Sequence, residues 1–361
     1  MHDFGAVQVE EAVADCVAVL GAVTDRDWRQ VRAGRLEWDC RRTVAHIASD
    51  LIAYAGQIAG RTQDAYTPFE INLDGREGGM DPADNAGCLQ VVTATGALLA
   101  AAVRTTPRAV RAFHPFPFRH ASREGFAAMG VAEVLLHTHD IAEGMGVAHT
   151  PRDELASFVL TRIFPHVKPG PTPWETLLWA TGRGDLPGRE PVTRWHWTNN
   201  PVLRSERLLL EGVTPAAAAE LALAGDGGHD WVDSGPFEGT REGAGMLVKQ
   251  YEEGVFDPEW AMYVLVRRED DRAVGAMGFH GAPDDDGGVE IGYDLSVDAR
   301  GNGYATEALR TLSAWALDQD GVRKVGAVVD EGNVPSQKVV TRAGFTEVSR
   351  QEGQISYELR G

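Results

Sequence analysis

Apolar residues recur with helical spacing through the first half of the chain, and strand-like alternation is rare there. This pattern predicts helices over residues 6–22, 43–59, 88–104, 125–144, 151–164 and 172–182. Long apolar faces on consecutive helices are typical of a bundle, because each helix must bury one face against its neighbours. We therefore predict an all-α, up-and-down four-helix bundle with a long polar loop over about residues 61–86.

The pattern changes near residue 200, which we take as the boundary between two domains, 1–198 and 203–361. Residues 192–197 alternate like a strand just before it, and short strand-like runs then lie between helical segments. The predicted strands are 207–210, 261–267, 273–280, 289–297, 324–329, 347–350 and 355–359. The predicted helices are 215–224, 244–253, 306–318 and 334–342. The second domain is thus expected to combine strands and helices, with two hairpins among the strands.

Composition and charge exclude several classes of protein. The chain has 361 residues and a formal net charge of −19, so nucleic acid is not expected as its main partner. Its three cysteines, Cys16, Cys40 and Cys88, form no Cys-x-x-Cys pair and are expected to be reduced thiols. We find neither a signal peptide nor an apolar run long enough to span a membrane. These features predict a cytoplasmic protein.

A glycine-rich turn between a strand and a helix predicts a phosphate-binding site at residues 298–305, Asp-Ala-Arg-Gly-Asn-Gly-Tyr-Ala. Gly301 and Gly303 let the backbone approach a ligand closely and adopt positive φ. The free N–H groups in the first turn of the following helix then point at the anion, and Arg300 adds positive charge. Taken alone, this turn is a weak signal, because ordinary strand-to-helix turns share its pattern.

A second motif follows about thirty residues later. Residues 333–336 read Asn-Val-Pro-Ser and residues 343–345 read Ala-Gly-Phe, directly after the predicted strand 324–329. In order and spacing, the two motifs resemble the GNAT superfamily of N-acetyltransferases, which carry Arg/Gln-x-x-Gly-x-Gly/Ala and then Asn-x-x-Ser with a Gly-Phe turn. Glu-Ile-Gly-Tyr at 290–293 is similar to the subgroup that acetylates ribosomal proteins and small amines. The resemblance covers roughly 203–361 and implies an α+β GNAT fold with a mixed sheet.

The resemblance implies acetyl-CoA as cosubstrate and assigns roles by position. Val297 is expected to pair its backbone with the pantetheine arm, and Asn333 to contact the cofactor through its side chain. The expected cofactor-binding residues are Val297, Arg300, Gly301, Asn302, Gly303, Tyr304, Ala305 and Asn333. Ser336 is expected near the CoA sulfur, where its hydroxyl can hydrogen-bond the leaving thiolate.

Acetyl transfer needs a base that removes a proton from the amine before it attacks the thioester. Glu290 is the strongest candidate, acting through a water, because the resemblance places it on the strand that faces the acetyl group. The alternative interpretation of Glu290 is a solvated strand carboxylate. Tyr293 and Tyr357 are candidate acids for the thiolate, and each is also interpretable as a packing residue.

Two histidines and a carboxylate on predicted helices form a second constellation. His46 lies on an apolar helical face, and Glu133 and His137 are four residues apart, so they share one face of a later helix. Two imidazoles and one carboxylate leave an open coordination position, which is the arrangement of catalytic zinc. His139 and Asp140 are adjacent candidates for a supporting role. The alternative is a buried polar cluster that ties two helices together.

These residues, with residues 125–130 and 178–183, resemble the N-terminal domain of mycothiol-dependent maleylpyruvate isomerase, within the wider DinB-like helical bundles. The resemblance covers about residues 1–198. It implies that the same three side chains bind a divalent metal, zinc by the donor set, and that the partner is a low-molecular-weight thiol. The second domain of that isomerase is replaced here by the acetyltransferase-like half, which puts isomerisation itself in doubt.

Together, the two constellations predict a two-domain N-acetyltransferase that acts on the primary amine of a small molecule or of a protein N-terminus. One alternative makes the helical domain the principal enzyme, a metal-dependent transferase that uses mycothiol or a related thiol. Another makes it a non-catalytic binding or dimerisation module. The sequence leaves the acyl acceptor and the oligomeric state open.

Overall fold

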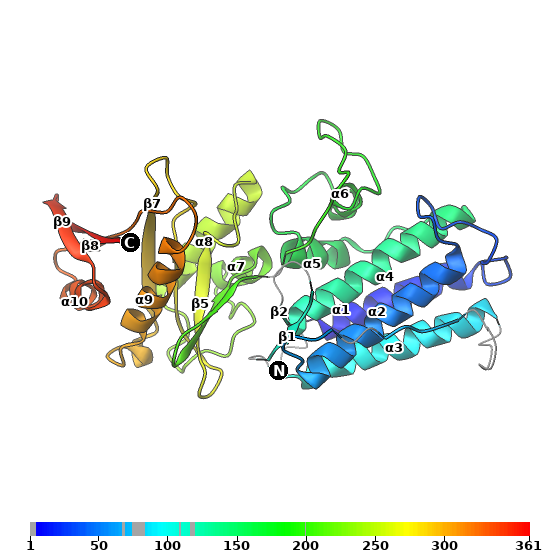
Figure 1. Ribbon diagram of the computed structural model, residues 1–361, viewed down its shortest axis with the longest axis horizontal. Coiled ribbons are helices and arrows are strands. Elements are labelled where there is room, and N and C mark those ends of the chain that lie inside the picture. Colours follow the sequence, from blue (N-terminus) through cyan, green and yellow to red (C-terminus); the bar gives the residue numbers. More distant parts are fainter. Residues whose placement is uncertain (1–4, 67–68, 74–83, 108–109, 116–119, 199) are drawn as a thin grey trace. The chain divides into compact units, whose positions relative to one another are not determined.

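The computed structural model describes residues 5–66, 69–73, 84–107, 110–115, 120–198 and 200–361. The chain folds into two compact units, which we call unit 1 (residues 1–199) and unit 2 (residues 200–361). Unit 1 is helical, and unit 2 combines helices with one large sheet (Figure 1). Each unit has its own core of buried apolar side chains.

Four long helices make up most of unit 1: α1 (Ala6–Gly21), α2 (Cys40–Gly60), α3 (Asn85–Thr105) and α4 (Arg123–Met145). Helices α1 and α2 each pack against both α3 and α4, around one apolar core. The remaining elements are the two-stranded antiparallel pair β1 (Arg111–Phe113) and β2 (His120–Ser122), and the shorter helices α5 (Asp153–Ile163) and α6 (Pro173–Ala180). The prediction that this half is helical is therefore confirmed.

Short polar side chains fix where the long helices begin. Asp39 accepts a hydrogen bond from the backbone N–H of Arg42 at the start of α2, and Asp84 and Ser122 cap α3 and α4 in the same way. Helix α2 therefore begins three residues before the predicted start at Thr43. The middle of the predicted loop over 61–86 lies outside the described residues.

Helix α3 is long and apolar enough, by length and composition alone, to cross a membrane, and no other helix in the described part of the chain is. This differs from the expectation that no segment of the sequence approaches such a span. The buried side chains of α3, among them Cys88, Val92 and Leu99, belong to the core of unit 1. The packing of α3 against its neighbours accounts for the apolar side chains on its buried face.

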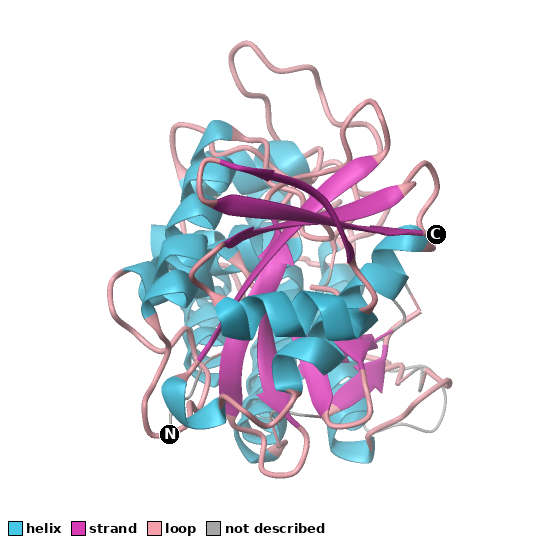
Figure 2. Ribbon diagram, turned by 90° about the vertical axis from the view of Figure 1, so that its left-hand side faces the viewer, coloured by secondary structure: helices cyan, strands magenta, loops and turns pink. Residues whose placement is uncertain are grey.

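Unit 2 is built on an eight-stranded sheet with the strand order β3-β4-β5-β6-β7-β8-β10-β9. Figure 2 draws its strands in magenta among the helices. The strands are β3 (Val202–Arg204), β4 (Leu208–Gly212), β5 (Met262–Arg267), β6 (Ala273–Phe279), β7 (Gly288–Leu295), β8 (Lys324–Asp330), β9 (Thr346–Gln351) and β10 (Gln354–Arg360). All neighbouring strands are antiparallel except β7 and β8, which are parallel. The sheet is therefore mixed, as predicted, and both predicted hairpins form.

The α-helices of unit 2 are α7 (Pro215–Ala222), α8 (Glu238–Glu253), α9 (Tyr304–Leu317) and α10 (Val334–Ala343). Side chains of β7 alternate between the two faces of the sheet. Ile291 and Leu295 join the apolar core together with Leu309 of α9, whereas Gly292 and Asp294 line a cavity under α8. Helices α8 and α9 therefore cover opposite faces of the sheet.

The parallel pair β7–β8 is short and then opens. Residues 288–290 of β7 pair with residues 324–326 of β8. Beyond these, β7 continues to Leu295 and β8 to Asp330, and no further pair joins the two strands within the described residues. The sheet consequently has a wedge-shaped gap in its middle, which we call the β7–β8 gap.

Candidate functional site

The β7–β8 gap holds a cavity of about 600 Å³. Its lining comes from both strands, from the start of α10 and from β10: Glu290, Ile291, Gly292, Tyr293, Ala327, Val328, Val329, Asp330, Asn333, Ser336 and Gln354. Glu290, Tyr293, Asn333 and Ser336, which the sequence analysis singled out, therefore line one cavity.

Strand β7 also directs backbone groups into this gap. The carbonyl of Glu290 accepts a hydrogen bond from the N–H of His280 at 3.0 Å, on the β6 side. Because the backbone groups of successive strand residues point to alternate sides, those of Ile291 and Tyr293 point into the gap. An extended ligand can pair with them as a neighbouring strand would.

The glycine-rich turn after β7 adopts the backbone conformation expected from its sequence. Gly301 and Gly303 both have a φ of +80°, a value that residues with a side chain rarely adopt. Gly303 is the N-cap of α9, and the first intrahelical hydrogen bond runs from the N–H of Glu307 to the carbonyl of Gly303. The N–H groups of residues 304–306 precede that bond and are available to an anion.

Two arginines support this turn. Arg300 donates a hydrogen bond to the carbonyl of Leu295 at 3.1 Å. Arg207, which the sequence analysis did not identify, donates to the carbonyl of Asn302 at 3.0 Å and pairs with Glu307 at 2.7 Å. Both side chains hold the turn in shape and place positive charge beside it.

Val297 lies outside β7, contrary to the prediction. The strand ends at Leu295, and Val297 begins a 3₁₀ turn, η1 (Val297–Ala299), in which its carbonyl is already an acceptor. The predicted strand 289–297 was too long, because the alternation of apolar residues continues to Val297 although the backbone turns after Leu295. The pairing of Val297 with the pantetheine arm stays a prediction, and Ile291 and Tyr293 offer further backbone groups to an extended ligand.

Tyr293 and Ser336 meet across the gap. The phenol oxygen lies 2.5 Å from the hydroxyl of Ser336 and 3.3 Å from its carbonyl oxygen. Burial raises the pKa of Tyr293 although the hydrogen bond to Ser336 lowers it, so the phenol stays protonated at neutral pH. Asn333 caps α10 by accepting from the N–H of Ser336, which fixes the position of that serine. Tyr357, the other candidate acid, is buried in the core.

The carboxylate of Glu290 lies 2.9 Å from Nδ1 of His280, within hydrogen-bonding distance. Both side chains are about half exposed. The ring of His280 lies over Gly292, with Nε2 only 2.9 Å from where a Cβ would stand, so a side chain at this position would displace the ring. His280 could not be recognised from the sequence, because only the β6–β7 register brings it to Glu290. Such a carboxylate–imidazole pair can accept and pass on a proton.

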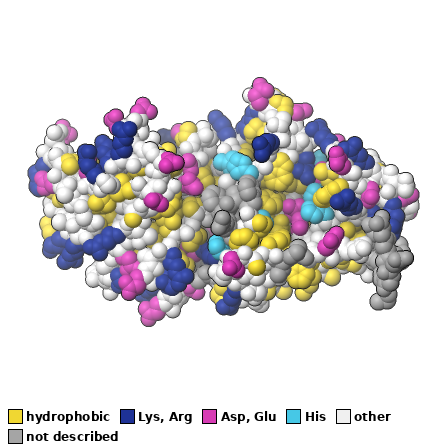
Figure 3. All heavy atoms as spheres, in the orientation of Figure 1, with side chains coloured by type: hydrophobic (Ala, Val, Ile, Leu, Met, Phe, Trp, Pro, Cys, Tyr) yellow, Lys and Arg dark blue, Asp and Glu magenta, His cyan; other side chains and the backbone are white. Residues whose placement is uncertain are grey.

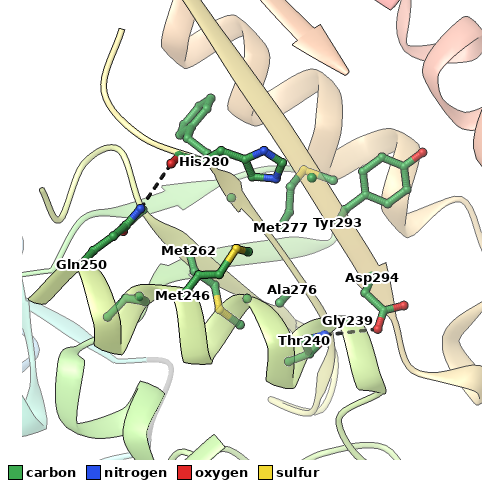
Figure 4. A pocket seen from close by; sticks show the side chains of 16 residues that line it. Gly239, Thr240, Met246, Gln250, Met262, Ala276, Met277, His280, Tyr293 and Asp294 are labelled. Atoms are coloured by element: carbon green, nitrogen blue, oxygen red, sulfur yellow. Dashed lines mark hydrogen bonds between the residues drawn. The ribbon is translucent and has the colours of Figure 1, made fainter. Parts of the chain in front are cut away.

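A second cavity of about 180 Å³ lies between α8 and strands β5 to β7 (Figure 4). Met246, Met262 and Met277 line it with flexible apolar side chains. His280 and Tyr293 also line it, and Tyr293 belongs to the β7–β8 gap as well. Because Gly292 and Tyr293 line both cavities, the methionine-lined cavity is adjacent to the gap.

Asp294 forms part of the wall of the methionine-lined cavity but has a structural role. Its carboxylate accepts from the N–H of Thr240 at 3.3 Å, in the first turn of α8, and lies 3.6 Å from the guanidinium of Arg300. Burial raises the pKa of Asp294. Helix α8 begins at Glu238, six residues before its predicted start, because β7 supplies this cap.

In unit 1, helices α2 and α4 bring together His46, Glu133 and His137. The carboxylate of Glu133 lies 3.1 Å from Nε2 of His137 and 3.6 Å from Nε2 of His46, and one donor atom from each residue lies within 4.8 Å of the others. Two imidazole nitrogens and a carboxylate oxygen are donors that zinc accepts. The side chain of His46 is 32% exposed, so the cluster is open to solvent.

Asp140 orients His137 within this cluster. Nδ1 of His137 lies 2.9 Å from the carboxylate of Asp140, which Arg183 also holds with a hydrogen bond of 2.9 Å. This contact leaves Nε2 of His137 directed at Glu133. Burial lowers the pKa of His137, but the hydrogen bonds to Asp140 and Glu133 outweigh it and raise the pKa to about 9. The electrostatics of the cluster thus favour positive charge.

Asp50 is a further member that the sequence analysis missed. It follows His46 by four residues on α2, and its carboxylate lies 3.2 Å from Nε2 of that histidine. Burial, followed by the charge of Glu133, raises the pKa of Asp50 to about 7. The four-residue spacing that linked Glu133 to His137 was present here too and would have revealed it.

Unit 2 is similar to known acetyltransferases. Residues 207–346 match the family model described as acetyltransferase (GNAT) domain. The Bacillus subtilis (strain 168) protein named uncharacterized N-acetyltransferase YjdG is 33% identical over 116 residues, which are 32% of this chain and 67% of YjdG. A second protein of the same strain, named uncharacterized N-acetyltransferase YoaA, is 24% identical over 152 residues, which are 40% of this chain and 82% of YoaA. Among solved structures, an acetyltransferase from Agrobacterium tumefaciens str. C58 is 23% identical with a TM-score of 0.33, over 48% of this chain and 100% of its own.

Proposed function

Because the chain belongs to the GNAT acetyltransferase family, we propose that unit 2 transfers the acetyl group of acetyl-CoA to a primary amine of a small molecule or a protein N-terminus. One observation carries the proposal. The β7–β8 gap is lined by a carboxylate with an imidazole partner, by a phenol paired with a hydroxyl and by open backbone groups, and the glycine-rich turn follows the strand that forms one of its walls.

The glycine-rich turn and β7 are proposed to bind the cosubstrate. The backbone of residues 301–305 and the charge of Arg300 would hold the pyrophosphate, because the glycine-rich turn leads directly to the open N–H groups at the start of α9. The backbone of Ile291 and Tyr293 would pair with the pantetheine arm in the gap. Asn333 lines the same cavity and offers its side-chain amide to that arm.

Glu290 and His280 are proposed to remove the proton of the attacking amine. Glu290 accepts the hydrogen on Nδ1 of His280, which leaves the lone pair of Nε2 over Gly292 at the methionine-lined cavity. As the amine nitrogen forms its bond to the thioester carbonyl carbon, its proton passes to this Nε2 or, through a water, to Glu290 directly. The tetrahedral intermediate then collapses with cleavage of the C–S bond, and the electron pair goes to sulfur.

Tyr293 is proposed to donate its hydroxyl hydrogen to the leaving thiolate, with Ser336 holding the phenol in place. Changing Tyr293 to Phe is expected to lower kcat about tenfold, because a hydrogen bond to a developing charge is lost. The KM for acetyl-CoA should change little, since the backbone of residue 293 is kept. Steady-state rates of CoA release would measure both values. An unchanged kcat would identify Tyr293 as a packing residue.

The acyl acceptor is proposed to enter the methionine-lined cavity, so that its amine reaches His280. The test is CoA release from acetyl-CoA by the full chain, against a panel of small amines and N-terminal peptides. Release that depends on one acceptor would support the proposal. Failure to bind acetyl-CoA in calorimetry would overturn it. A cytoplasmic location, where acetyl-CoA is made and used, belongs to the same proposal.

A separate observation favours a second function, in unit 1. The convergence of His46, Glu133 and His137 leads us to propose that unit 1 is a DinB-like bundle that holds a divalent metal, zinc by its donors. The residues fit such an ion, because Asp140 orients one imidazole and His46 is open to solvent. A bound metal would supply the positive charge that turns a low-molecular-weight thiol, such as mycothiol, into its thiolate. Unit 1 without metal would be a non-catalytic module.

Changing Asp140 to Asn is expected to weaken zinc binding about 10- to 100-fold, because the carboxylate no longer orients His137. Competition titration against a chromophoric chelator, with protein first stripped of metal, would measure the affinity. Asp15 offers a matched control, since its carboxylate lies 2.8 Å from Nε2 of His149 in the same unit. Asp15→Asn should leave zinc affinity unchanged, and an equal loss in both variants would point to general destabilisation of unit 1.

A further inference from the structure

A third cavity, of about 540 Å³, lies in unit 1 at the end of α6. Three stretches line it: residues 166–168 after α5, residues 179–180 at the end of α6, and the segment 189–196. Its volume is in the range of cavities that enclose small organic ligands. In the space-filling view, histidine side chains gather beside a basic one over the α5–α6 part of the chain (Figure 3). His46, Glu133 and His137, the candidate metal ligands, are not among the residues that line this cavity.

The walls of this cavity present flat aromatic surfaces. The rings of His166 and His196 stack in parallel, with centroids 4.9 Å apart and planes within 2°. Trp179 forms another wall, and Trp195 is 40% exposed although large aromatic side chains are usually covered. Burial, and secondarily the neighbouring His196, lowers the pKa of His166 to about 4, so this ring is neutral at neutral pH. The cavity is therefore suited to stacking against a planar ring.

The rim of the cavity carries positive charge, in a chain whose formal net charge is −19. Arg189 is occupied structurally, because its guanidinium donates to the carbonyl of Lys168 and lies 4.9 Å from the ring centroid of Trp179. The ammonium group of Lys168 and the guanidinium of Arg194 have no ion-pair or hydrogen-bond partner among the residues that the structure describes. The lining includes one carboxylate, that of Glu190. Two cations are thus left for a ligand.

We propose that this cavity is a binding site for a planar aromatic anion. The aromatic ring of the ligand stacks on the exposed faces of Trp195 and the histidine pair, and its carboxylate or phosphate pairs with Lys168 and Arg194. A ligand with a ring but no charge would gain binding energy from stacking only, and a small anion without a ring would meet a mostly apolar lining. Tight binding therefore needs both the ring and the anionic group. Every residue in this site belongs to unit 1.

The test uses the full chain and three probes in calorimetric titrations. Naphthoate carries both a ring and a carboxylate, naphthalene methanol carries the ring without the charge, and AMP carries a ring with a phosphate. We expect naphthoate or AMP to bind about tenfold tighter than naphthalene methanol. Tighter binding of AMP would identify a phosphate ligand, and tighter binding of naphthoate a carboxylate ligand. Equal affinity for all three, or no binding at millimolar concentration, would overturn the proposal.

Variants then locate the binding. Arg194→Gln and Trp195→Ala are each expected to weaken the tighter probe about tenfold, the first through the lost charge and the second through the lost stacking surface. Arg152, an exposed arginine of the same unit, provides the control for net charge, and Arg152→Gln should leave affinity unchanged. Both test side chains are exposed, so thermal melting should confirm that the variants fold. Unchanged affinity in folded Arg194→Gln and Trp195→Ala would show that the probe binds elsewhere and would refute the site.

Discussion

Changing Glu290 to Gln is expected to lower kcat/KM for acetyl transfer about 100-fold or more while leaving the affinity for acetyl-CoA unchanged. Glutamine has the size of glutamate and can still accept a hydrogen bond from Nδ1 of His280, but it carries no charge to stabilise a proton on that ring. Initial rates of CoA release at varied acceptor concentration give kcat/KM, and calorimetry gives the acetyl-CoA affinity. An unchanged rate would remove Glu290 from the mechanism.

His280 distinguishes the two routes that the proton can take. If the proton passes to Nε2 of His280, then His280→Gln should cost as much as Glu290→Gln, and the double variant should lose little more. If a water carries it to Glu290, His280→Gln should cost clearly less than Glu290→Gln. Glu347 is the matched control, because it is an exposed strand carboxylate that pairs with Arg350 on β9. Glu347→Gln should leave kcat/KM within twofold of the parent, roughly the effect of a surface charge.

Changing Gly301 to Ala is expected to raise the KM for acetyl-CoA at least tenfold. The φ of +80° costs a residue with a side chain about 1–2 kcal/mol, and the turn can relieve this strain by moving its amides away from the pyrophosphate. A tenfold change in KM corresponds to about 1.4 kcal/mol, so the strain alone is of the right size. Steady-state kinetics with acetyl-CoA as the varied substrate would measure the effect.

Gly353 provides an unusually close control for this variant. It also has a φ of +80°, and a Cβ at either glycine would meet nothing within 4 Å, but Gly353 lies in the turn between β9 and β10. Gly301→Ala and Gly353→Ala should therefore lower the melting temperature by similar amounts. Only Gly301→Ala should raise KM. A similar KM for both variants would show that the glycine-rich turn does not bind the cosubstrate.

The glycine-rich turn could be predicted from sequence because its chemistry is local. Positive φ at Gly301 and Gly303 and the open amides of α9 follow from residues that are neighbours in the chain. Val297 shows the limit of such reasoning. Its apolar side chain continues the alternation of β7, and nothing in the spacing indicates that the backbone turns after Leu295.

Features that depend on pairing between distant segments could not be predicted. The contact of His280 with Glu290 requires the β6–β7 register, and the early start of α8 requires a cap from Asp294, more than fifty residues away. Residues 238–243 read Glu-Gly-Thr-Arg-Glu-Gly, which has no apolar period and two glycines, so local propensity argues against a helix there. Tertiary hydrogen bonding overrides that propensity.

In unit 1, too, local features could be predicted from the sequence and contacts between distant segments could not. The four-residue spacing placed Glu133 and His137 on one face of α4, but only the packing of α2 on α4 brings His46 to them. Residues 192–197 alternate like a strand, yet they are irregular in the structure. Trp195 packs near Phe164, with ring centroids 6.0 Å apart. The alternation of apolar residues therefore reflects aromatic packing and not the hydrogen bonding of a β-strand to a neighbour.

The short pairing of β7 with β8 has a mechanical consequence. The sheet consists of a five-stranded part (β3 to β7) and a three-stranded part (β8, β10 and β9). The two parts are joined only where three residues of β7 pair with three residues of β8, and we call this short pairing the joint. Gly288 and Gly326 lie in this joint, and Glu290 is its last paired residue. A slight rotation at the joint would be amplified along the diverging strands. The width of the opening between Tyr293 and Ser336 would therefore depend on packing at this joint, where Glu290 itself lies.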